Sequence, residues 1–191
     1  STQITNHKNT KRSHPDEIWI GLISISDRAS QGVYQDEGVP ALEKWFSQAL
    51  TSPWHMETRL IPDEKETIST TICELVDVIG CDLILTTGGT GPSRRDVTPE
   101  ALEGLFEKRI DGFGETFRWI SFQKIGTSTM QSRAVAGVAN ATYIFALPGS
   151  TGACKDGWDD ILRQQLDIRF RPCNFAELMP RLNEGKMPRS G

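Results

Sequence analysis

The sequence lacks the cysteine and histidine patterns that indicate a metal centre or a disulfide framework. Its four cysteines are widely spaced and include no CxxC pair, and its three histidines do not cluster. Structural zinc sites need ligands at short spacing, and small disulfide-bonded domains are much richer in cysteine. We therefore expect reduced, buried thiols and no catalytic triad built on histidine.

Positive charge and long apolar runs are also scarce. The 21 Lys and Arg residues are outnumbered by 25 Asp and Glu residues, which gives a net charge of −4, whereas a nucleic-acid-binding surface needs a basic stripe. No apolar run approaches the roughly 20 residues of a membrane span. The N-terminal residues have no apolar signal-peptide core. These absences predict a cytoplasmic protein with neither a nucleic-acid nor a membrane partner.

Apolar, β-branched stretches alternate with segments of helical periodicity, which is typical of an α/β domain. We predict strands over 18–26, 56–62 and 81–87, joined by helices over 39–50 and 68–79. Because the connections are short and the strands apolar, a mostly parallel sheet with crossover helices is the natural arrangement. The prediction is a single α/β domain over 18–182, a three-layer sandwich, with a flexible polar extension at 1–17 and a tail at 183–191.

Further elements are predicted after residue 97. Thr98 has the side chain of a helix N-cap, and Pro99 suits the first helical position. The predicted elements are a helix from Thr98 to Phe106, a helix from about Gly114 to Lys124, two strands around a turn at Asn140, and a last helix over 154–166.

Chemically distinctive segments follow the predicted strands. They are "SDRAS", "PDE", "GGTGPSRRD" and "LPGST". In open α/β sheets ligands bind at the carboxyl ends of the strands, close to the point where the strand order reverses. We therefore expect these loops to converge on one edge of the sheet.

The glycine-rich loop comprises Gly88, Gly89, Thr90 and Gly91. Glycines allow backbone amides to approach an anion and to form a concave nest for phosphate. The loop has neither the Walker A pattern nor the GxGxxG dinucleotide pattern. Taken alone, it is explained equally well as a tight turn between a strand and a helix.

Charged residues surround this loop, and each has two interpretations. Arg94 and Arg95 could clamp a phosphate, or could be solvated or paired with Asp96. Asp96 could orient Arg95 or hold the Mg²⁺ carried by a nucleotide, and Asp63 could be a helix N-cap. Two carboxylates beside a phosphate nest would suit metal-assisted phosphoryl or nucleotidyl transfer, in which the protein needs no nucleophile of its own.

Several of these segments together resemble a known family. "GLISISDRASQGVYQDEG", "RLIPDE" and "TTGGTGPSRRDVTPEAL" are similar to the molybdopterin adenylyltransferases of the MogA type, whose domain also occurs in gephyrin and its plant counterpart. The C-terminal half, from "GFGETFRW" to "DGWDDIL", is closer to the sister MoaB type. Its Ser150-Thr151 stands where the adenylyltransferases commonly have a variable residue and proline. The resemblance extends from about Ile18 to Leu182.

The resemblance implies a molybdopterin-binding, Rossmann-like domain that assembles as a homotrimer. It implies transfer of AMP from Mg-ATP to molybdopterin, with Mg²⁺ as cofactor and a hand-off of the product to the molybdate-inserting enzyme. Asp63 and Asp96 become the catalytic and metal-binding residues. The substrate-binding residues that the resemblance implies are Ser26, Asp27, Gly88, Gly89, Thr90, Gly91, Ser132, Pro148, Gly149 and Ser150. Arg94 and Arg95 join them because their charge could offset that of the departing pyrophosphate.

Two alternatives remain open. The MoaB-like half favours a non-catalytic molybdopterin-binding protein, and the fold could also serve another nucleotide substrate. The aromatic residues Trp19, Trp45, Trp54, Trp119 and Trp158 are predicted in the core or at a subunit interface, and Tyr34 and Phe122 in packing. Phe113 and Phe117 could belong to the core or to a subunit contact, and Met130 and Gln131 could line the pterin pocket.

Overall fold

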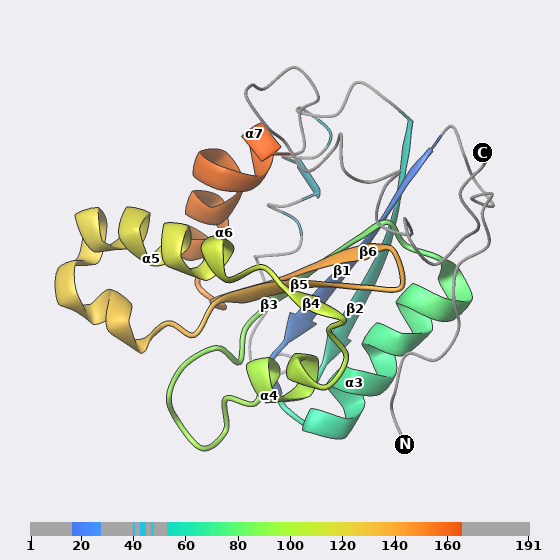
Figure 1. The fold of residues 1–191 in the computed structure, drawn as a ribbon, viewed down its shortest axis with the longest axis horizontal. Helices are drawn as coiled ribbons and strands as arrows, with labels where there is room; N and C mark the ends of the chain where they lie inside the picture. The colour runs from blue at the N-terminus through green and yellow to red at the C-terminus, as the bar shows by residue number, and fades with distance from the viewer. Residues whose placement is uncertain (1–16, 28–39, 41–42, 45–46, 48–52, 166–191) are drawn as a thin grey trace, which may run out of the picture.

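The computed structural model describes residues 17–27, 40, 43, 44, 47 and 53–165. This part of the chain forms one six-stranded sheet with helices on both faces (Figure 1). The predicted helix over 39–50, the extension 1–17 and the tail lie mostly or wholly outside the described residues, as do Tyr34 and Trp45. No helix in the described ranges is long and apolar enough to cross a membrane.

The sheet has the strand order β2-β1-β3-β6-β5-β4. Its first four members run parallel, and β5 and β4 are antiparallel additions at one edge. Thr87 pairs with Ser24 on one side and with Leu147 on the other, and Ile25 pairs with Ile61. The carboxyl ends of the four parallel strands are therefore level. The strands are β1 (Ile18–Ile25), β2 (Trp54–Ile61), β3 (Leu83–Thr87), β4 (Lys108–Arg109), β5 (Val135–Ala139) and β6 (Thr142–Leu147).

Helices cover the two faces of the sheet as separate layers. In Figure 1, α3 and α4 lie below the sheet, and α5 and α6 lie above it. The lower layer contains α3 (Lys65–Cys73), its π-helical continuation η1 (Glu74–Ile79) and α4 (Thr98–Glu103). The upper layer contains α5 (Asp111–Ile125), the 3-10 segment η2 (Gly126–Gln131), α6 (Thr151–Gly157), η3 (Trp158–Leu162) and α7 (Arg163–Gln165).

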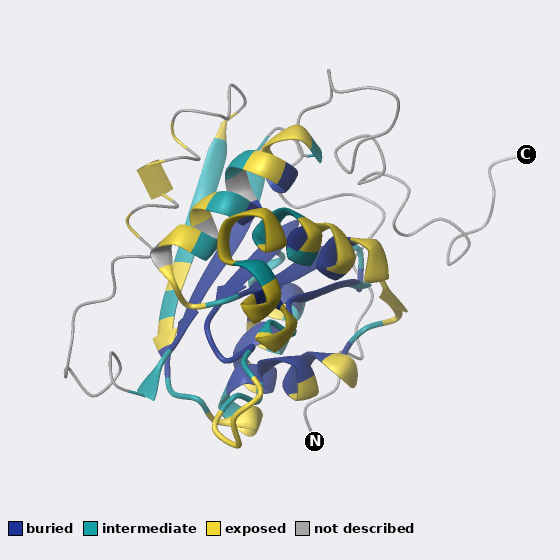
Figure 2. Cartoon of the chain, turned by 90° about the vertical axis from the view of Figure 1, so that its left-hand side faces the viewer, coloured by how far each residue is buried: buried dark blue, intermediate teal, exposed yellow. Residues whose placement is uncertain are grey.

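Side chains alternate between the two faces of the sheet, because the period of a strand is two residues. Leu85 of β3 and Phe145 of β6 join Phe113 of α5 in the upper core, whereas Ile84 and Ile144 belong to the lower core. Both faces of the inner strands are covered, which explains why β1 and β6 are largely apolar. Figure 2 shows these buried strands between helices that are exposed on their outer sides.

The predicted order of strands and helices from Trp54 onward and the final helix are confirmed, and so is the turn between β5 and β6. Asn140 and Ala141 both have positive φ, 46° and 61°, as a two-residue type I′ turn requires. Asparagine tolerates this conformation better than most residues. The two-residue strand β4 was not predicted, because it is too short to show any periodicity.

Three predicted boundaries were wrong. Thr98 is the first residue of α4 instead of its N-cap, which is Val97. The buried Thr98 hydroxyl donates instead to the carbonyl oxygen of Gly88, at 2.9 Å. The helix ends at Glu103 rather than Phe106, because Phe106 turns back to pack against the lower core. Helix α5 also begins at Asp111, ahead of the expected Gly114.

Candidate active site

A cavity of about 640 Å³ lies at the carboxyl ends of the parallel strands. The chain runs from β1 to β2 on one side and then crosses to β3 on the other, so the strand order reverses at β1. Ligands bind at this place in open α/β sheets, and the volume suits a small molecule. The loops after β1, β2, β3 and β6 form one wall, and α5 with η2 forms the other.

The glycine-rich loop is a tight turn that only glycine can make. Gly88 and Gly89 have φ of 102° and 71°, and a Cβ atom at either would lie 2.2 Å from an oxygen, the Ile25 carbonyl or the Thr98 hydroxyl. The Gly88 amide donates to Leu147 at 2.9 Å, and the Thr98 amide donates to Gly89 at 3.0 Å. The loop is thus fixed to β6 and to the start of α4.

The same loop presents backbone donors. Within the described ranges, no hydrogen bond is made by the amides of Gly89, Thr90 and Gly91. All three residues line the cavity, and Thr90 is buried. The tight turn and the phosphate nest are therefore compatible interpretations of one loop.

Two carboxylates are locked together at the ends of β1 and β2. The Asp27 amide donates to Asp63 Oδ2 at 3.1 Å, and the Asp63 amide donates to Asp27 Oδ1 at 2.8 Å. Asp63 does not cap α3, whose N-cap position is Glu64 without a side-chain bond. Burial, followed by the negative charges of Asp27 and Asp96, raises the pKa of Asp63 above its ordinary value, against the lowering effect of the Asp27 amide.

Asp96 is held by its own loop. Its Oδ2 accepts from the Ser93 hydroxyl at 2.6 Å and from the Ser93 amide at 3.2 Å. A Cβ atom at Gly91 would lie 2.7 Å from this oxygen, so glycine leaves room for the carboxylate. Asp96 lines the same cavity as Asp27 and Asp63. Three carboxylates thus share one wall.

The two loop arginines point to different places. Arg95 lines the cavity, and its Nε lies 3.6 Å from Asp27 Oδ2, so the pairing with Asp96 considered from the sequence is not formed. The Arg95 side chain remains 65% exposed. Arg94 is exposed and does not belong to the cavity lining. Only one of the two is placed to meet a ligand there.

Arg133 is a residue that the sequence analysis missed. Its guanidinium donates to the carbonyl oxygens of Gly91 at 2.9 Å and Asp96 at 2.8 Å, and it pairs with Glu100. These partners are 33 to 42 residues away in sequence. The only sequence signal was its position beside Ser132.

The helical wall is largely neutral. Phe117, Ser121 and Ile125 are spaced four residues apart on α5, and all three face the cavity. Ser128, Thr129 and Gln131 of η2 continue this wall. Spacing on α5 could have indicated these residues, but nothing in the sequence marked that helix as facing a ligand.

The loop after β6 closes the site. Gly149 packs against the glycine-rich loop, since a Cβ atom there would lie 3.2 Å from the Gly88 Cα. The Ser150 hydroxyl accepts from the Ala153 amide at 3.1 Å, which satisfies a free donor at the start of α6. Ser150 therefore has a structural role as well as a place in the cavity lining.

Comparison with known proteins identifies the family. The family model described as "Probable molybdopterin binding domain" matches residues 21–168. The chain belongs to this family. The resemblance found in the sequence is thereby confirmed at the level of the family.

Relatives of both types are found among curated proteins. A molybdopterin adenylyltransferase of Escherichia coli K12 is 53% identical over 137 residues, covering 72% of this chain and 70% of that protein. A molybdenum cofactor biosynthesis protein B from the same organism is 61% identical over 93 residues, covering 49% of this chain and 55% of that protein. The MoaB structure of Thermus thermophilus superposes with a TM-score of 0.69 at 33% identity, covering 76% of this chain and 89% of that one. The three-layer α/β fold agrees with this relationship.

In this member of the family, the cavity gathers nearly all residues singled out from the sequence. Arg94 is the exception, and Met130 is also outside the lining and is 79% exposed. Gln131 does line the cavity. The gathered residues are Ser26, Asp27, Asp63, Gly88, Gly89, Thr90, Gly91, Arg95, Asp96, Ser132, Pro148, Gly149 and Ser150.

The cavity carboxylates are better suited to a Mg²⁺ ion that is bound to a nucleotide than to a metal ion held by the protein alone. In the part of the chain that the structure describes, no group of three or more His, Cys, Asp and Glu side chains could hold a metal. Mg²⁺ typically takes only one or two protein carboxylates and completes its shell with phosphate and water. Asp63 and Asp96, on the wall that carries the amide nest, offer that limited set.

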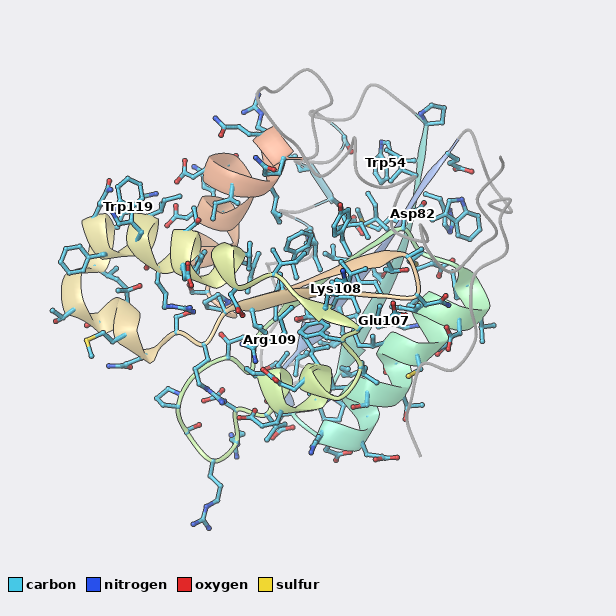
Figure 3. The ribbon with its side chains drawn as sticks, viewed as in Figure 1. Trp54, Asp82, Glu107, Lys108, Arg109 and Trp119 are labelled. Carbon is cyan, nitrogen blue, oxygen red and sulfur yellow. The ribbon has the colours of Figure 1, made fainter. Side chains whose placement is uncertain are left out.

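The aromatic residues divide between core and surface. Phe113 and Phe117 are buried in the upper core, although Phe117 also reaches the cavity. Trp119 projects from α5 away from the sheet (Figure 3) and is 67% exposed. Phe122 is also exposed, so the packing role predicted for it is not found in the described chain.

Proposed function

We propose that this protein is a molybdopterin adenylyltransferase of molybdenum cofactor biosynthesis. It transfers AMP from ATP to the terminal phosphate of molybdopterin, giving adenylyl-molybdopterin and pyrophosphate. The observation that carries the proposal is the composition of one cavity: an amide nest and three carboxylates on one wall, and a neutral helical wall opposite. The relationship to an enzyme of that name at 53% identity supports the same chemistry.

The reaction needs no nucleophile from the protein. A terminal phosphate oxygen of molybdopterin attacks the α-phosphorus of ATP and forms the new phosphoanhydride bond. The bond from the α-phosphorus to the oxygen that bridges to the β-phosphate breaks, and pyrophosphate leaves with its electron pair. Transfers of this kind depend on positioning and on electrostatic stabilisation.

Each part of the sheet-edge wall has a role in this scheme. The amides of Gly89, Thr90 and Gly91 hold the α-phosphate, whose negative charge suits a nest of N–H groups. Asp63 and Asp96 would hold the Mg²⁺ that accompanies ATP. When bound, that ion supplies charge neutralisation at the phosphates.

Arg95 contributes beside these groups. Its guanidinium is mostly exposed and reaches the cavity from the loop, so it can meet the charge that develops on the departing pyrophosphate. Arg94 has no support for the same role, because it is outside the lining. We retain Ser26, Asp27, Ser132, Pro148, Gly149 and Ser150 as substrate-binding residues from their place in the cavity.

The second candidate function is a molybdopterin-binding protein without catalysis. The relationship to the cofactor biosynthesis protein B, at 61% identity over part of the chain, favours it. The carboxylates favour the enzyme, because acidic side chains would repel an anionic ligand unless a cation accompanied it. The two candidates therefore differ in whether Mg-ATP binds.

Anaerobic turnover of molybdopterin with Mg-ATP tests the proposal, with adenylyl-molybdopterin followed by chromatography. We expect many turnovers per active site and pyrophosphate in equal amount. Protein that binds molybdopterin but forms no product, and ignores Mg-ATP in calorimetry, would establish the binding function instead. Turnover of another nucleotide acceptor in place of molybdopterin would reassign the substrate.

The proposal extends to assembly and location. We propose a homotrimer that passes its product to the molybdate-inserting enzyme. Exposed apolar side chains on α5 and η2 support a subunit contact, since apolar residues of this kind are frequent at interfaces; they are Trp119, Phe122, Ile125 and Met130. The free thiols of Cys73 and Cys81 suit the reducing cytoplasm. Light scattering at several protein concentrations would test the trimer.

A further inference from the structure

One arginine outside the cavity holds both ends of the loop that carries Asp96. Arg133 Nε donates to the carbonyl oxygen of Gly91 at 2.9 Å, and Nη2 donates to the carbonyl oxygen of Asp96 at 2.8 Å. The Arg133 amide donates to the carbonyl oxygen of Thr90 at 2.8 Å. A single residue thus contacts the backbone where the loop leaves the glycine nest and where it returns at Asp96.

The guanidinium is itself fixed from the other side by Glu100. Nη1 of Arg133 pairs with Glu100 Oε1, and Nη2 lies 3.4 Å from Oε2. This contact, as its main cause, holds the pKa of Glu100 below its ordinary value. A planar guanidinium can serve two carbonyls and a carboxylate at once, which an ammonium group cannot do with the same geometry.

The other hydrogen bonds of this loop are local: Ser93 donates to the Asp96 carboxylate, and the Asp96 amide donates to the Ser93 carbonyl oxygen at 3.1 Å. Residues 91–97 form no helix or strand, and their exposed side chains include Ser93, Arg94 and Arg95. Exposed connecting segments are mobile unless their backbone is tied down. Arg133 lies next to the sheet, since β5 begins two residues later at Val135. The preceding residue, Ser132, lines the cavity.

We infer that Arg133 is a positioning residue, which aligns the Asp96 carboxylate with the amides of the glycine nest, and that Glu100 holds its guanidinium in place. The inference rests on the proposed function. Arg133 does not line the cavity. It lies in a second hollow of about 480 Å³ with Glu100, Arg109 and Arg118. Its effect on the reaction must therefore pass through the loop.

The matched control is Arg109, which lies in the same hollow. Its guanidinium pairs with Glu103 and Asp111 and makes no contact with the loop. Arg133→Lys keeps the positive charge but removes the planar guanidinium that donates to both carbonyl oxygens. Glu100→Gln removes the negative charge that pairs with Arg133. Arg109→Lys makes the same arginine-to-lysine change at a residue that does not contact the loop.

Hydrogen exchange of the backbone amides across residues 90–97 is the first measurement. We expect faster exchange in Arg133→Lys and to a smaller degree in Glu100→Gln, with no change in Arg109→Lys or in the strands β1 and β3. Unchanged exchange in Arg133→Lys would overturn the inference. This readout does not depend on turnover, so it separates failure of the positioning role from failure of the proposed function.

Steady-state kinetics is the second measurement. We expect kcat of Arg133→Lys to fall on the order of tenfold or more, since small displacements of a catalytic group have large effects. The KM for molybdopterin and the thermal midpoint should stay close to those of Arg109→Lys. Added ethylguanidinium should restore part of the turnover of Arg133→Ala and none in Arg109→Ala. A kcat equal to that of Arg109→Lys, or a change confined to the molybdopterin KM, would contradict the positioning role.

Discussion

The two walls of the cavity differ in their secondary structure and in the charge of their side chains. The sheet-edge wall consists of loops that join level strand ends, with three carboxylates and a glycine turn fixed by mutual hydrogen bonds. The helical wall consists of α5 and η2, whose contribution is an aromatic ring, an isoleucine, hydroxyl groups and an amide. The charged residues of the cavity are thus concentrated on the wall that is built from hydrogen-bonded loops at the ends of the parallel strands.

We propose that this difference separates the residues that take part in the reaction from those that recognise the substrate. Groups that stabilise a developing charge must be held in place before the reaction, which the ends of a buried sheet provide. Groups that recognise a neutral part of a substrate tolerate a looser support. We therefore expect substitutions on the sheet-edge wall to change kcat, and substitutions on the helical wall to change KM.

The largest expected effect comes from the carboxylates. Asp63→Asn and Asp96→Asn should each lower kcat by about 10²–10³-fold, the usual result of removing one preorganised electrostatic contact. The KM for molybdopterin should change little. Asp111→Asn is the control, because Asp111 is an exposed carboxylate that pairs with Arg109 away from the cavity. Full turnover in either site variant would remove that aspartate from the mechanism.

The glycine turn should show the next largest effect, on folding. In Gly88→Ala a Cβ atom would lie 2.2 Å from the Ile25 carbonyl oxygen at a φ of 102°, so we expect a loss of more than about 1 kcal/mol in the free energy of unfolding. Gly104→Ala is the control, because Gly104 has φ of −72° and nothing within 4 Å. Urea denaturation measures both, and equal stability of the two variants would contradict the strain argument.

Sequence reasoning reached the sheet-edge wall because its signals are local. The segment "IWIGLISIS" is mostly apolar because both faces of its strand are covered, and parallel strands bring the loops after them to one edge. The glycines marked a turn whose positive φ the structure displays at Gly88 and Gly89. A turn that requires glycine at particular positions can be predicted from the sequence, because the glycines themselves indicate the backbone conformation.

What the sequence did not reveal depends on contacts between distant residues. Arg133 meets Gly91 from 42 positions away, and no local pattern encodes that contact. Arg94 and Arg95 are adjacent in sequence, yet only Arg95 lines the cavity. The direction of each side chain depends on the path of the loop backbone, which contacts with distant residues determine. Thr98 has a side chain that is typical of an N-cap, but its hydroxyl donates a tertiary hydrogen bond to the carbonyl oxygen of Gly88.

A smaller effect concerns the free energy of unfolding, which the partly buried negative charge of Asp63 lowers. Burial, and then the charges of Asp27 and Asp96, raise the pKa of Asp63 from its ordinary value of 3.8. The folded protein then binds this proton more tightly than the unfolded chain does. Ionisation of Asp63 therefore costs stability as the pH rises from the unfolded value through the raised folded value, and the cost is constant above it.

Asp63→Asn should consequently be more stable than the unmodified protein at neutral pH, because asparagine keeps an acceptor for the Asp27 amide without the buried charge. The advantage should shrink as the pH falls through the raised folded pKa toward 3.8. Thermal unfolding across this pH range measures it. A lower midpoint at neutral pH would show that the charge of Asp63 stabilises the fold, and the trade between stability and activity at this wall would be refuted.

The smallest expected effect lies on the helical wall. Ser121→Ala and Ser128→Ala each remove one hydroxyl from the cavity lining, and a hydrogen bond of about 0.5–1.5 kcal/mol corresponds to a change of roughly two- to twelvefold in KM. Thr127→Ala is the control, since Thr127 is an exposed hydroxyl of the same segment that lies outside the lining. We expect the KM for molybdopterin to rise and kcat to stay within about twofold. A fall in kcat with KM unchanged would mean that this wall also acts only in the transition state, and the division between a wall for chemistry and a wall for recognition would then fail.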